Sequence, residues 1–303
     1  MMREARVNRP IIIDEGISSG IPYVRLSDIG NFSVFKTFDC GQCFRFDPIS
    51  TEHGFEVSGT AFGHTVSFAE DGGHLVIKGC DASEYGSLWE RYLSLDTDYD
   101  EIDSFVTTVL DEVGCAVMRR AAEVSRGIRL LRQDPWETLC SFIISQNNNI
   151  PRIKKIISSL CENYGEATAD GRSLAFPTAR ALADAGEEKI FALKTGFRAG
   201  YIVDAARKVA DGEIDLDRVM ACDTYAEAEA ELLRIRGVGP KVAACALLFG
   251  FGRTEAYPID TWMKKVAARH FPEGLDHTKF GKYAGIAQQY LFYMERYIGD
   301  DAK

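Results

Sequence analysis

A change in hydrophobic periodicity near residue 81 constrains the fold of this chain more than any other feature. Between about residues 20 and 80, short runs such as FSVFKTF, FEVSGTAF, HTVSFAE and HLVIKG alternate apolar with polar residues and are separated by Gly and Asp. Such alternation is typical of antiparallel strands with one buried face. From residue 81 onward the apolar residues follow helical spacing. The sequence therefore predicts an α+β protein with an N-terminal antiparallel sheet domain, residues 1–115, and a mainly helical domain, residues 116–303.

The helices of the second part are marked by start signals. The clearest set is Asp134 as a predicted N-cap, Pro135 at the first helical position and Glu137 in a position that completes a capping-box-like arrangement. The predicted helices lie near residues 83–94, 100–112, 116–125, 135–146, 150–163, 199–210, 224–235, 240–250, 261–270 and 278–297.

Composition excludes several classes of protein. No apolar run reaches the roughly 18 residues that span a bilayer, and the start MMREARVNRPIII lacks the apolar core of a secretion signal. We therefore expect an intracellular protein, which in a bacterium would lie in the cytoplasm or nucleoid. The eight cysteines are scattered and do not suggest a disulfide framework. Cys40 and Cys43 form one CxxC pair, but a structural zinc site needs a second ligand pair, so we predict no zinc.

The charge distribution is uneven. The net charge of −10 argues against a protein that binds nucleic acid mainly through a global positive field. Residues 81–115 carry ten acidic side chains and one basic side chain, whereas residues 117–160 carry eight basic and three acidic ones. The acidic stretch is predicted to face away from phosphates. The basic stretch fits a phosphate-binding surface or an ordinary solvated face.

The most informative segment is LLRIRGVGPKVAACALLFGFG, residues 232–252, which predicts two helices joined by a tight turn. Gly237 and Gly239 permit the turn, and Pro240 suits the start of the second helix. Free backbone amides at such a helix start bind phosphate, so an acidic protein can hold DNA in this way. A purely structural helix corner is the alternative.

Two titratable residues near this turn are candidates for chemistry. Lys241 lies in the first turn of the second helix, where the helix dipole disfavours the ammonium form, although a nucleophilic lysine also needs desolvation. An exposed surface lysine is the alternative. Asp260 follows Pro258 in AYPIDTWMKK and is a predicted N-cap. The connection between the two motifs is short enough to return this carboxylate towards Lys241.

Six separated motifs occur in an order that resembles the helix-hairpin-helix DNA glycosylases, and within them the 8-oxoguanine DNA glycosylase family. They are GQCFRF, LLRQDPWETLCSFIISQNNNIPRI, Phe197–Arg198, GVGPKVAAC, PID and AQQYLF, and the resemblance covers roughly residues 25–297. It implies a TBP-like sheet domain followed by a helix-hairpin-helix glycosylase domain. It also implies excision of 8-oxoguanine, and of formamidopyrimidine guanine, opposite cytosine in duplex DNA.

The resemblance implies a mechanism in which Lys241 attacks the sugar C1′ and expels the base while Asp260 assists and stabilises the charge on the ribose. The Schiff base then undergoes β-elimination, which makes the enzyme a bifunctional glycosylase and lyase. Gly41 would accept the extra N7 hydrogen of the lesion through its carbonyl. Cys245 and Phe292 would sandwich the flipped base.

Further roles are implied for residues around this pocket. Gln288 would read the pairing edge of the base, and Phe197 would act as a wedge in the duplex. The residues that would read the unpaired cytosine are Asn147, Arg152 and Arg198. Main-chain carbonyls of Leu233, Ile235 and Val238 would bind a cation.

This sequence departs from the eukaryotic pattern at two positions, since Trp262 replaces a histidine and Ala244 an aspartate. The chain lacks the spaced C-terminal cysteines of an iron–sulfur cluster, so we predict neither a cluster nor any required cofactor. We expect a monomer that binds double-stranded DNA and no membrane. Two alternatives stay open: a glycosylase that removes alkylated purines by activating water with Asp260, and a DNA-binding module without catalytic activity.

Overall fold

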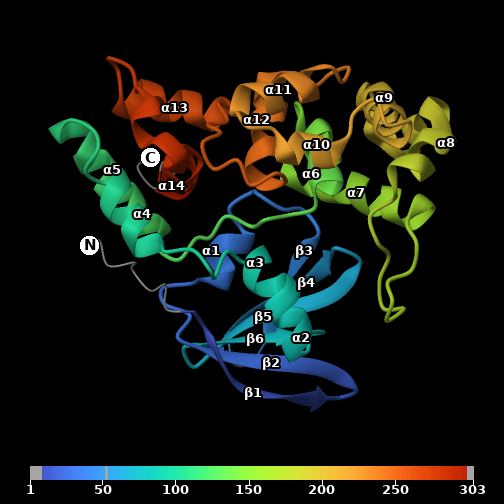
Figure 1. The fold of residues 1–303 in the computed structure, drawn as a ribbon, viewed down its shortest axis with the longest axis horizontal. Coiled ribbons are helices and arrows are strands. Elements are labelled where there is room, and N and C mark those ends of the chain that lie inside the picture. The colour runs from blue at the N-terminus through green and yellow to red at the C-terminus, as the bar shows by residue number, and fades with distance from the viewer. Residues whose placement is uncertain (1–8, 52–53, 299–303) are drawn as a thin grey trace.

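The computed structural model describes residues 9–51 and 54–298, and it consists of a sheet-containing part and a helical part (Figure 1). Residues 1–8 of the predicted first domain lie outside the described residues. The sheet has the strand order β1-β2-β6-β5-β4-β3, and all neighbouring strands are antiparallel. The predicted fold class is therefore confirmed. The strands are β1 (Ile11–Ser18), β2 (Ile21–Ser27), β3 (Phe46–Thr51), β4 (Gly54–Ala61), β5 (His64–Asp71) and β6 (His74–Lys78).

One face of the sheet is buried because alternate residues of its central strands are apolar. Phe68 on β5 and Ile77 on β6 are fully buried. A helical segment covers this face, and its Trp89 ring lies 5.6 Å from the Phe68 ring. The segment comprises α2 (Ala82–Glu84), η1 (Tyr85–Trp89) and α3 (Glu90–Tyr92).

The run FSVFKTF is not a strand as predicted, because its second half forms the helix α1 (Val34–Phe38). Ser33 caps the helix by accepting a hydrogen bond from the Lys36 amide. Val34, Thr37 and Phe38 are buried at a helical spacing of three and four residues. The prediction was wrong because this short sequence is compatible with both patterns. Its apolar residues alternate as in a strand, but Ser33 can also cap a helix whose buried positions are three and four residues apart.

The helical part follows α3. Its elements are α4 (Tyr99–Val106), α5 (Glu112–Ser125), α6 (Pro135–Ser145), α7 (Ile150–Tyr164), α8 (Ala179–Ile190), η2 (Phe191–Thr195), α9 (Arg198–Ala210), α10 (Leu216–Ala221), α11 (Tyr225–Leu233), α12 (Pro240–Phe249), α13 (Thr261–His270), η3 (His277–Tyr283) and α14 (Ala284–Ile298). The predicted helices are present, but α8 and α10 were not predicted. None of the described helices is long and apolar enough to cross a lipid bilayer.

The start of α6 follows the prediction in part. Asp134 caps the helix by accepting a hydrogen bond from the Glu137 amide at 2.8 Å, and Pro135 occupies the first turn. The Glu137 side chain does not close a capping box. It instead pairs with Arg45 of the sheet part at 3.2 Å. This carboxylate therefore connects the two parts of the molecule.

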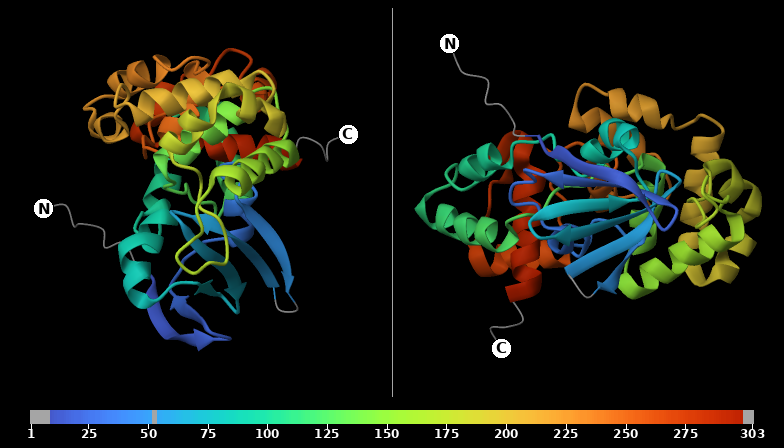
Figure 2. Two further views of the ribbon diagram at one scale, coloured as in Figure 1. Left: turned by 90° about the vertical axis from the view of Figure 1, so that its right-hand side faces the viewer. Right: turned by 90° about the horizontal axis from the view of Figure 1, so that it is seen from below.

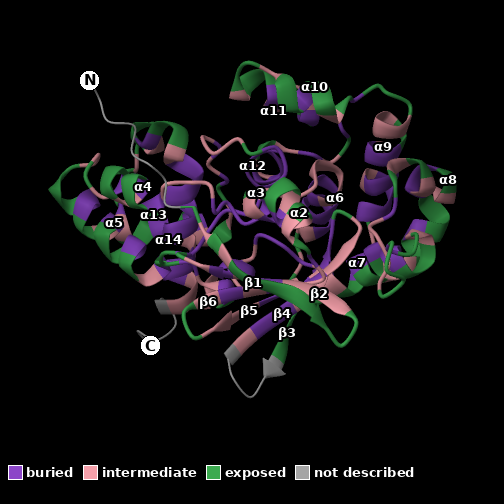
Figure 3. Cartoon of the chain, turned by 60° about the horizontal axis from the view of Figure 1, so that its bottom comes forward, coloured by how far each residue is buried: buried purple, intermediate pink, exposed green. Residues whose placement is uncertain are grey.

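Two hydrophobic cores divide the chain near residue 95 (Figure 3). The first contains residues from Val24 to Leu95 together with Leu131, and the second runs from Tyr99 to Met294. Cys40 and Phe44 belong to the second core although they precede most of the sheet. The predicted domain boundary at residue 115 stays a prediction.

A loop between α7 and α8 connects the helical part to the sheet (Figures 1 and 2). Its Ser173 hydroxyl lies 2.7 Å from the Thr60 hydroxyl on β4. Asp170 accepts a hydrogen bond from Thr65 on β5 at 3.1 Å, and Arg172 donates to the Thr65 carbonyl at 3.0 Å. We call residues 165–175 the strap.

Candidate active site

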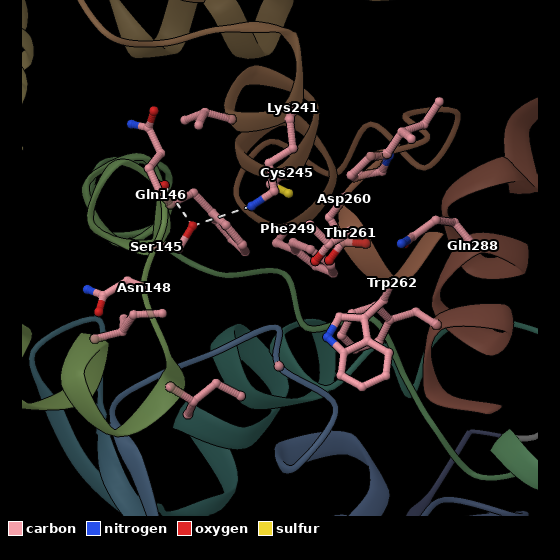
Figure 4. Close-up of a pocket in the computed structure, with 18 of the residues that line it drawn as sticks. Ser145, Gln146, Asn148, Lys241, Cys245, Phe249, Asp260, Thr261, Trp262 and Gln288 are labelled. Atoms are coloured by element: carbon pink, nitrogen blue, oxygen red, sulfur yellow. Dashed lines mark hydrogen bonds between the residues drawn. The ribbon is translucent and has the colours of Figure 1, made fainter. Parts of the chain in front are cut away.

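A cavity of about 570 Å³ lies where the loop before β3 meets helices α6, α12, α13 and α14 (Figure 4). It brings together predicted site residues that are up to 251 positions apart in the sequence, from 41 to 292. The predicted residues that line it are Gly41, Asn147, Gly239, Lys241, Cys245, Asp260, Gln288 and Phe292. Arg152, Phe197, Arg198 and Gly237 are not part of the lining.

Lys241 is half-buried in the first turn of α12. Its Nζ donates a hydrogen bond to Ser145 Oγ at 3.4 Å and lies 5.3 Å from the centroid of the Phe142 ring. Figure 4 shows this bond across the cavity. The amine is therefore held by a long hydrogen bond to Ser145 and by the Cys245 thiol, and because it lines the cavity it is accessible to a bound substrate.

Asp260 lines the same cavity as Lys241. It is the N-cap residue of α13, and the start of this helix lies at the cavity wall. Its side chain accepts a hydrogen bond from the Met263 amide at 2.8 Å, which confirms the predicted N-cap. Burial raises the pKa of the neighbouring Cys245 thiol to about 11. The positive charge of Lys241 lowers this pKa, and the negative charge of Asp260 raises it. Lys241, Cys245 and Asp260 all line the same cavity, so the amine and the carboxylate face one common space.

The turn before α12 uses its two glycines differently. Gly237 has φ +80°, and a Cβ there would lie 2.3 Å from the Tyr201 ring. Only glycine fits this position. Gly239 has an ordinary extended backbone, and a Cβ there would meet nothing within 4 Å. Its open surface, with no side-chain cap on the α12 amides, leaves the helix start free to approach a phosphate.

The wall opposite Lys241 comes from α14. Gln288 is 4% exposed, and its side-chain oxygen has no hydrogen-bond partner among the described residues. A buried amide oxygen without a partner is costly and is satisfied by a ligand that donates a hydrogen bond. Phe292 lies on the same helix, and the Trp262 ring meets it edge-on at 6.5 Å. Ala244, the second departure from the eukaryotic pattern, is buried within α12.

The three predicted cytosine readers cluster at the edge of the cavity, where Asn147 is part of the lining and Arg152 and Arg198 are not. Arg198 is buried and donates from Nε to the Gln146 carbonyl at 2.8 Å and from Nη2 to the Asn147 carbonyl at 2.9 Å. Burial, and then the charge of Arg152, lower the pKa of Arg198. Asn147 is exposed with φ +47°. The cluster holds two cations and an amide at one edge of the cavity.

The predicted wedge residue is an exposed aromatic next to this cluster. The Phe197 side chain is 53% exposed, and the Arg198 guanidinium carbon lies 4.4 Å from the centroid of its ring. A large apolar ring at the surface is available for contact with bases. The roles of these residues in DNA binding stay predictions.

Sequence reasoning missed three side chains that organise the site. Ser145 binds the Lys241 amine, Gln42 anchors the loop around Gly41, and Gln289 binds that loop from α14. Gln42 and Gln289 both lie within motifs that carry the family resemblance. A buried glutamine in a short motif was the available signal, since buried amides are retained only with hydrogen-bond partners.

The described residues contain no group of three or more His, Cys, Asp or Glu side chains that could hold a metal ion. Burial raises the pKa of Cys40 to about 12, and its Sγ donates to the Thr37 carbonyl. The carbonyls proposed for a cation lie on the turn between α11 and α12. That of Ile235 accepts the Val238 amide at 3.0 Å, so the cation site at Leu233, Ile235 and Val238 stays a prediction.

Family models match nearly the whole described chain. Residues 26–139 match the N-terminal domain of 8-oxoguanine DNA glycosylase, and residues 140–279 match the HhH-GPD superfamily of base excision DNA repair proteins. An N-glycosylase/DNA lyase of Saccharomyces cerevisiae is 34% identical, and the match covers 65% of this chain and 65% of that protein. The chain therefore spans slightly less than two thirds of the yeast relative.

Two further relatives match over more of their length. The N-glycosylase/DNA lyase OGG1 of Arabidopsis thaliana is 31% identical over 86% of this chain and 76% of that protein. The 8-oxoguanine glycosylase/lyase of Clostridium acetobutylicum, solved with double-stranded DNA containing cytosine opposite 8-oxoguanine, is 34% identical. It superposes with a TM-score of 0.85, covering 96% of this chain and 99% of that chain. The chain therefore belongs to the 8-oxoguanine DNA glycosylase family of the HhH-GPD superfamily.

Proposed function

We propose that this protein is a bifunctional DNA glycosylase and lyase that removes 8-oxoguanine opposite cytosine from double-stranded DNA. The observation that carries the proposal is the placement of Lys241 and Asp260 beside one cavity whose lining includes Gln288, with a side-chain oxygen that has no partner among the described residues. An amine, a carboxylate and a cavity that can admit a base are the parts needed for glycosidic bond cleavage. The names of the relatives support the same activity.

The reaction begins when the damaged nucleotide leaves the stack and its base enters the cavity. The Lys241 amine attacks C1′, the bond from C1′ to N9 breaks, and the base leaves with the bonding electrons. Asp260 stabilises the positive charge that develops on the sugar. The amine nitrogen loses a proton and the C1′–O4′ bond breaks, so the sugar ring opens with a hydroxyl at C4′ and a Schiff base at C1′. Loss of a proton from C2′ of this Schiff base then breaks the C3′–O bond, which releases the strand on the 3′ side.

The remaining site residues take the roles that the family resemblance implies. Gly41 accepts the N7 hydrogen of the lesion, Cys245 and Phe292 hold the base between them, and Gln288 reads its pairing edge. Asn147, Arg152, Arg198 and Phe197 contact the opposite strand, while the amides after Gly239 bind a phosphate. The additions, eliminations and proton transfers of this reaction consume no oxidant or reductant, so we propose that the protein needs no redox cofactor. One lesion needs one pocket, so we propose a monomer, in a compartment that holds DNA.

The test is incubation with a duplex containing 8-oxoguanine opposite cytosine in the presence of borohydride. Wild type should form a covalent adduct, and Lys241→Gln should form none, because only an amine gives a reducible Schiff base. Lys265→Gln is the matched control, since this exposed lysine lies on α13 with its Nζ 4.1 Å from the centroid of the Trp262 ring. Base release without an adduct in wild type would favour the water-activating alternative, and DNA binding without base release would favour the non-catalytic one.

A further inference from the structure

The loop that carries Gly41 is fastened to the last helix of the chain. Gly41 lies between α1 and β3 with φ +79°, and it lines the cavity. A Cβ at Gly41 would lie 3.8 Å from the Phe292 ring. The peptide of Gly41 therefore faces the helix that supplies the base-binding wall.

Three side chains of α14 hydrogen-bond to the main chain just before Gly41. Gln289 donates from Nε2 to the Cys40 carbonyl at 2.9 Å. Arg296 donates from Nη1 to the Asp39 carbonyl at 3.1 Å. The Tyr297 hydroxyl shares its one hydrogen between the same carbonyl, at 2.8 Å, and the Asp39 carboxylate.

A second set of bonds fixes the main chain just after Gly41. Gln42 is 1% exposed, and its Nε2 donates to the Thr37 and Arg129 carbonyls, each at 2.8 Å. Its Oε1 accepts the Leu131 amide at 2.9 Å. Gly41, the residue with the greatest backbone freedom, is thus held between two anchored neighbours.

The contacts from α14 do more than stabilise the loop, because the same helix carries the base-reading side chains. Gln288 and Phe292 lie on α14 between or beside the residues that bind the loop. A carbonyl recognises a single N–H only when its distance and angle are right. The three bonds set the position of the Gly41 carbonyl relative to Gln288 and Phe292.

We propose that Gln289, Arg296 and Tyr297 are positioning residues for lesion recognition. Their hydrogen bonds join the Gly41 loop to α14. They therefore fix the distance between the Gly41 carbonyl, which accepts the N7 hydrogen, and Gln288, which reads the pairing edge of the flipped base. This inference rests on the proposed function, and it assigns to these three side chains no contact with the substrate.

The test compares two substrates that share the Lys241 chemistry but differ in whether a base must be read. Gln289→Met removes the donor with similar volume, and Tyr297→Phe removes one hydroxyl. Single-turnover excision of 8-oxoguanine should fall roughly tenfold in Gln289→Met, because the buried Cys40 carbonyl loses its donor, and in Tyr297→Phe, because the Asp39 carbonyl loses one of its two hydrogen bonds to α14. Nicking of a preformed abasic site, which carries no base, should stay at the wild-type rate.

The matched control is Tyr293→Phe, because this tyrosine stacks on Tyr297 at 4.3 Å but makes no hydrogen bond to the loop. It should leave both rates unchanged. An equal fall in excision and abasic-site nicking would mean a general structural defect and would overturn the proposal, as would unchanged excision in both variants. Failure of wild type to excise 8-oxoguanine would instead reject the proposed function.

Binding supplies a second measurement that does not depend on turnover. In a Lys241→Gln background, the ratio of Kd for a guanine duplex to Kd for an 8-oxoguanine duplex should fall roughly tenfold when Tyr297→Phe is added. Affinity for a duplex with an abasic-site analogue should not change. A ratio equal to that of the background would contradict a positioning role.

Discussion

Asp260 has two tasks that a single substitution can separate. Its carboxylate caps α13 through the Met263 amide, and it lies beside Lys241 in the cavity. Asparagine caps helices as well as aspartate but carries no charge. We expect Asp260→Asn to change the free energy of unfolding by less than about 0.5 kcal/mol and to slow base release on the order of 100-fold. Chemical denaturation and single-turnover kinetics measure the two effects.

Asp260→Ala is the comparison for this prediction. It loses both the charge and the cap, so it should also lower stability by about 1 kcal/mol. An Asp260→Asn protein that keeps the wild-type rate would show that the carboxylate only caps the helix.

A second prediction at this scale concerns Glu137, which is paired with Arg45. Burial raises the pKa of Glu137 to about 7, although Arg45 offsets part of the shift. The folded state therefore binds a proton that the unfolded chain releases near pH 4.5. Stability should fall as the pH rises from about 4.5 to 7, by at most about 3 kcal/mol, and level off above.

Urea denaturation of wild type and Glu137→Gln between pH 5 and 8 measures this effect. The variant should lose most of the slope between pH 5 and 7, because its amide does not titrate. Glu188→Gln, which changes an exposed acid on α8, should keep the wild-type slope. Identical slopes in wild type and Glu137→Gln would contradict the assignment.

The sequence predicted those site residues whose type is unusual for their local context. Lys241 follows a glycine turn at a helix start, and Asp260 follows a proline, so each could be identified from its neighbours. The partners of Ser145 and Gln289 could not, because each side chain acts on a group from a distant segment, 96 and 249 positions away, even though Gln289 lies in a recognisable motif. Such pairings depend on tertiary packing, which no local pattern encodes.

At the scale of elements, the hairpin before α12 offers a comparison between two glycines. We expect Gly237→Ala to lower the free energy of unfolding by about 1–3 kcal/mol, because alanine at φ +80° is strained and its Cβ meets Tyr201. Gly239→Ala should leave stability within about 0.5 kcal/mol, since its backbone is ordinary and its surroundings open.

Duplex affinity should be sensitive to Gly239, the glycine whose substitution has the smaller effect on stability. The Gly239 methyl would project where a phosphate approaches the α12 amides, so Gly239→Ala should weaken duplex binding without lowering Tm. Thermal unfolding and a duplex titration of both variants test the pair. Unchanged affinity in Gly239→Ala would argue that this turn is only a helix corner.

Elements were predictable where burial repeats with one clear period. Burial alternates along β6, and α12 has glycine and proline at its start. The helix α8 was missed because Gly186 interrupts it with φ +77° and few of its residues are buried. The helix α10 has six residues and one buried side chain, Val219, too short a segment to show a period.

At the scale of the molecule, the strap connects two parts that have separate cores. Asp170 organises it by accepting hydrogen bonds from Thr168, Arg172 and Thr65. We expect Asp170→Ala to increase the rate of tryptic cleavage after Arg172 roughly tenfold, because loss of these bonds raises the population of the open loop. Asp184→Ala, an exposed acid on α8, should be cleaved like wild type. Equal rates in all three proteins would mean that the strap does not restrain the loop.

The order in which a ribosome makes this chain has a consequence for the cavity. The loop with Gly41 is made long before α14, and Cys40 and Phe44 pack in the core of the helical part. Gln288 and Phe292, which line the same cavity as Gly41, follow Lys241 and Asp260 in the chain. A chain still being translated therefore contains Lys241 and Asp260 before it contains the wall proposed to select a base. That wall can form only after α14 has been made, because the same helix completes both the core and the cavity.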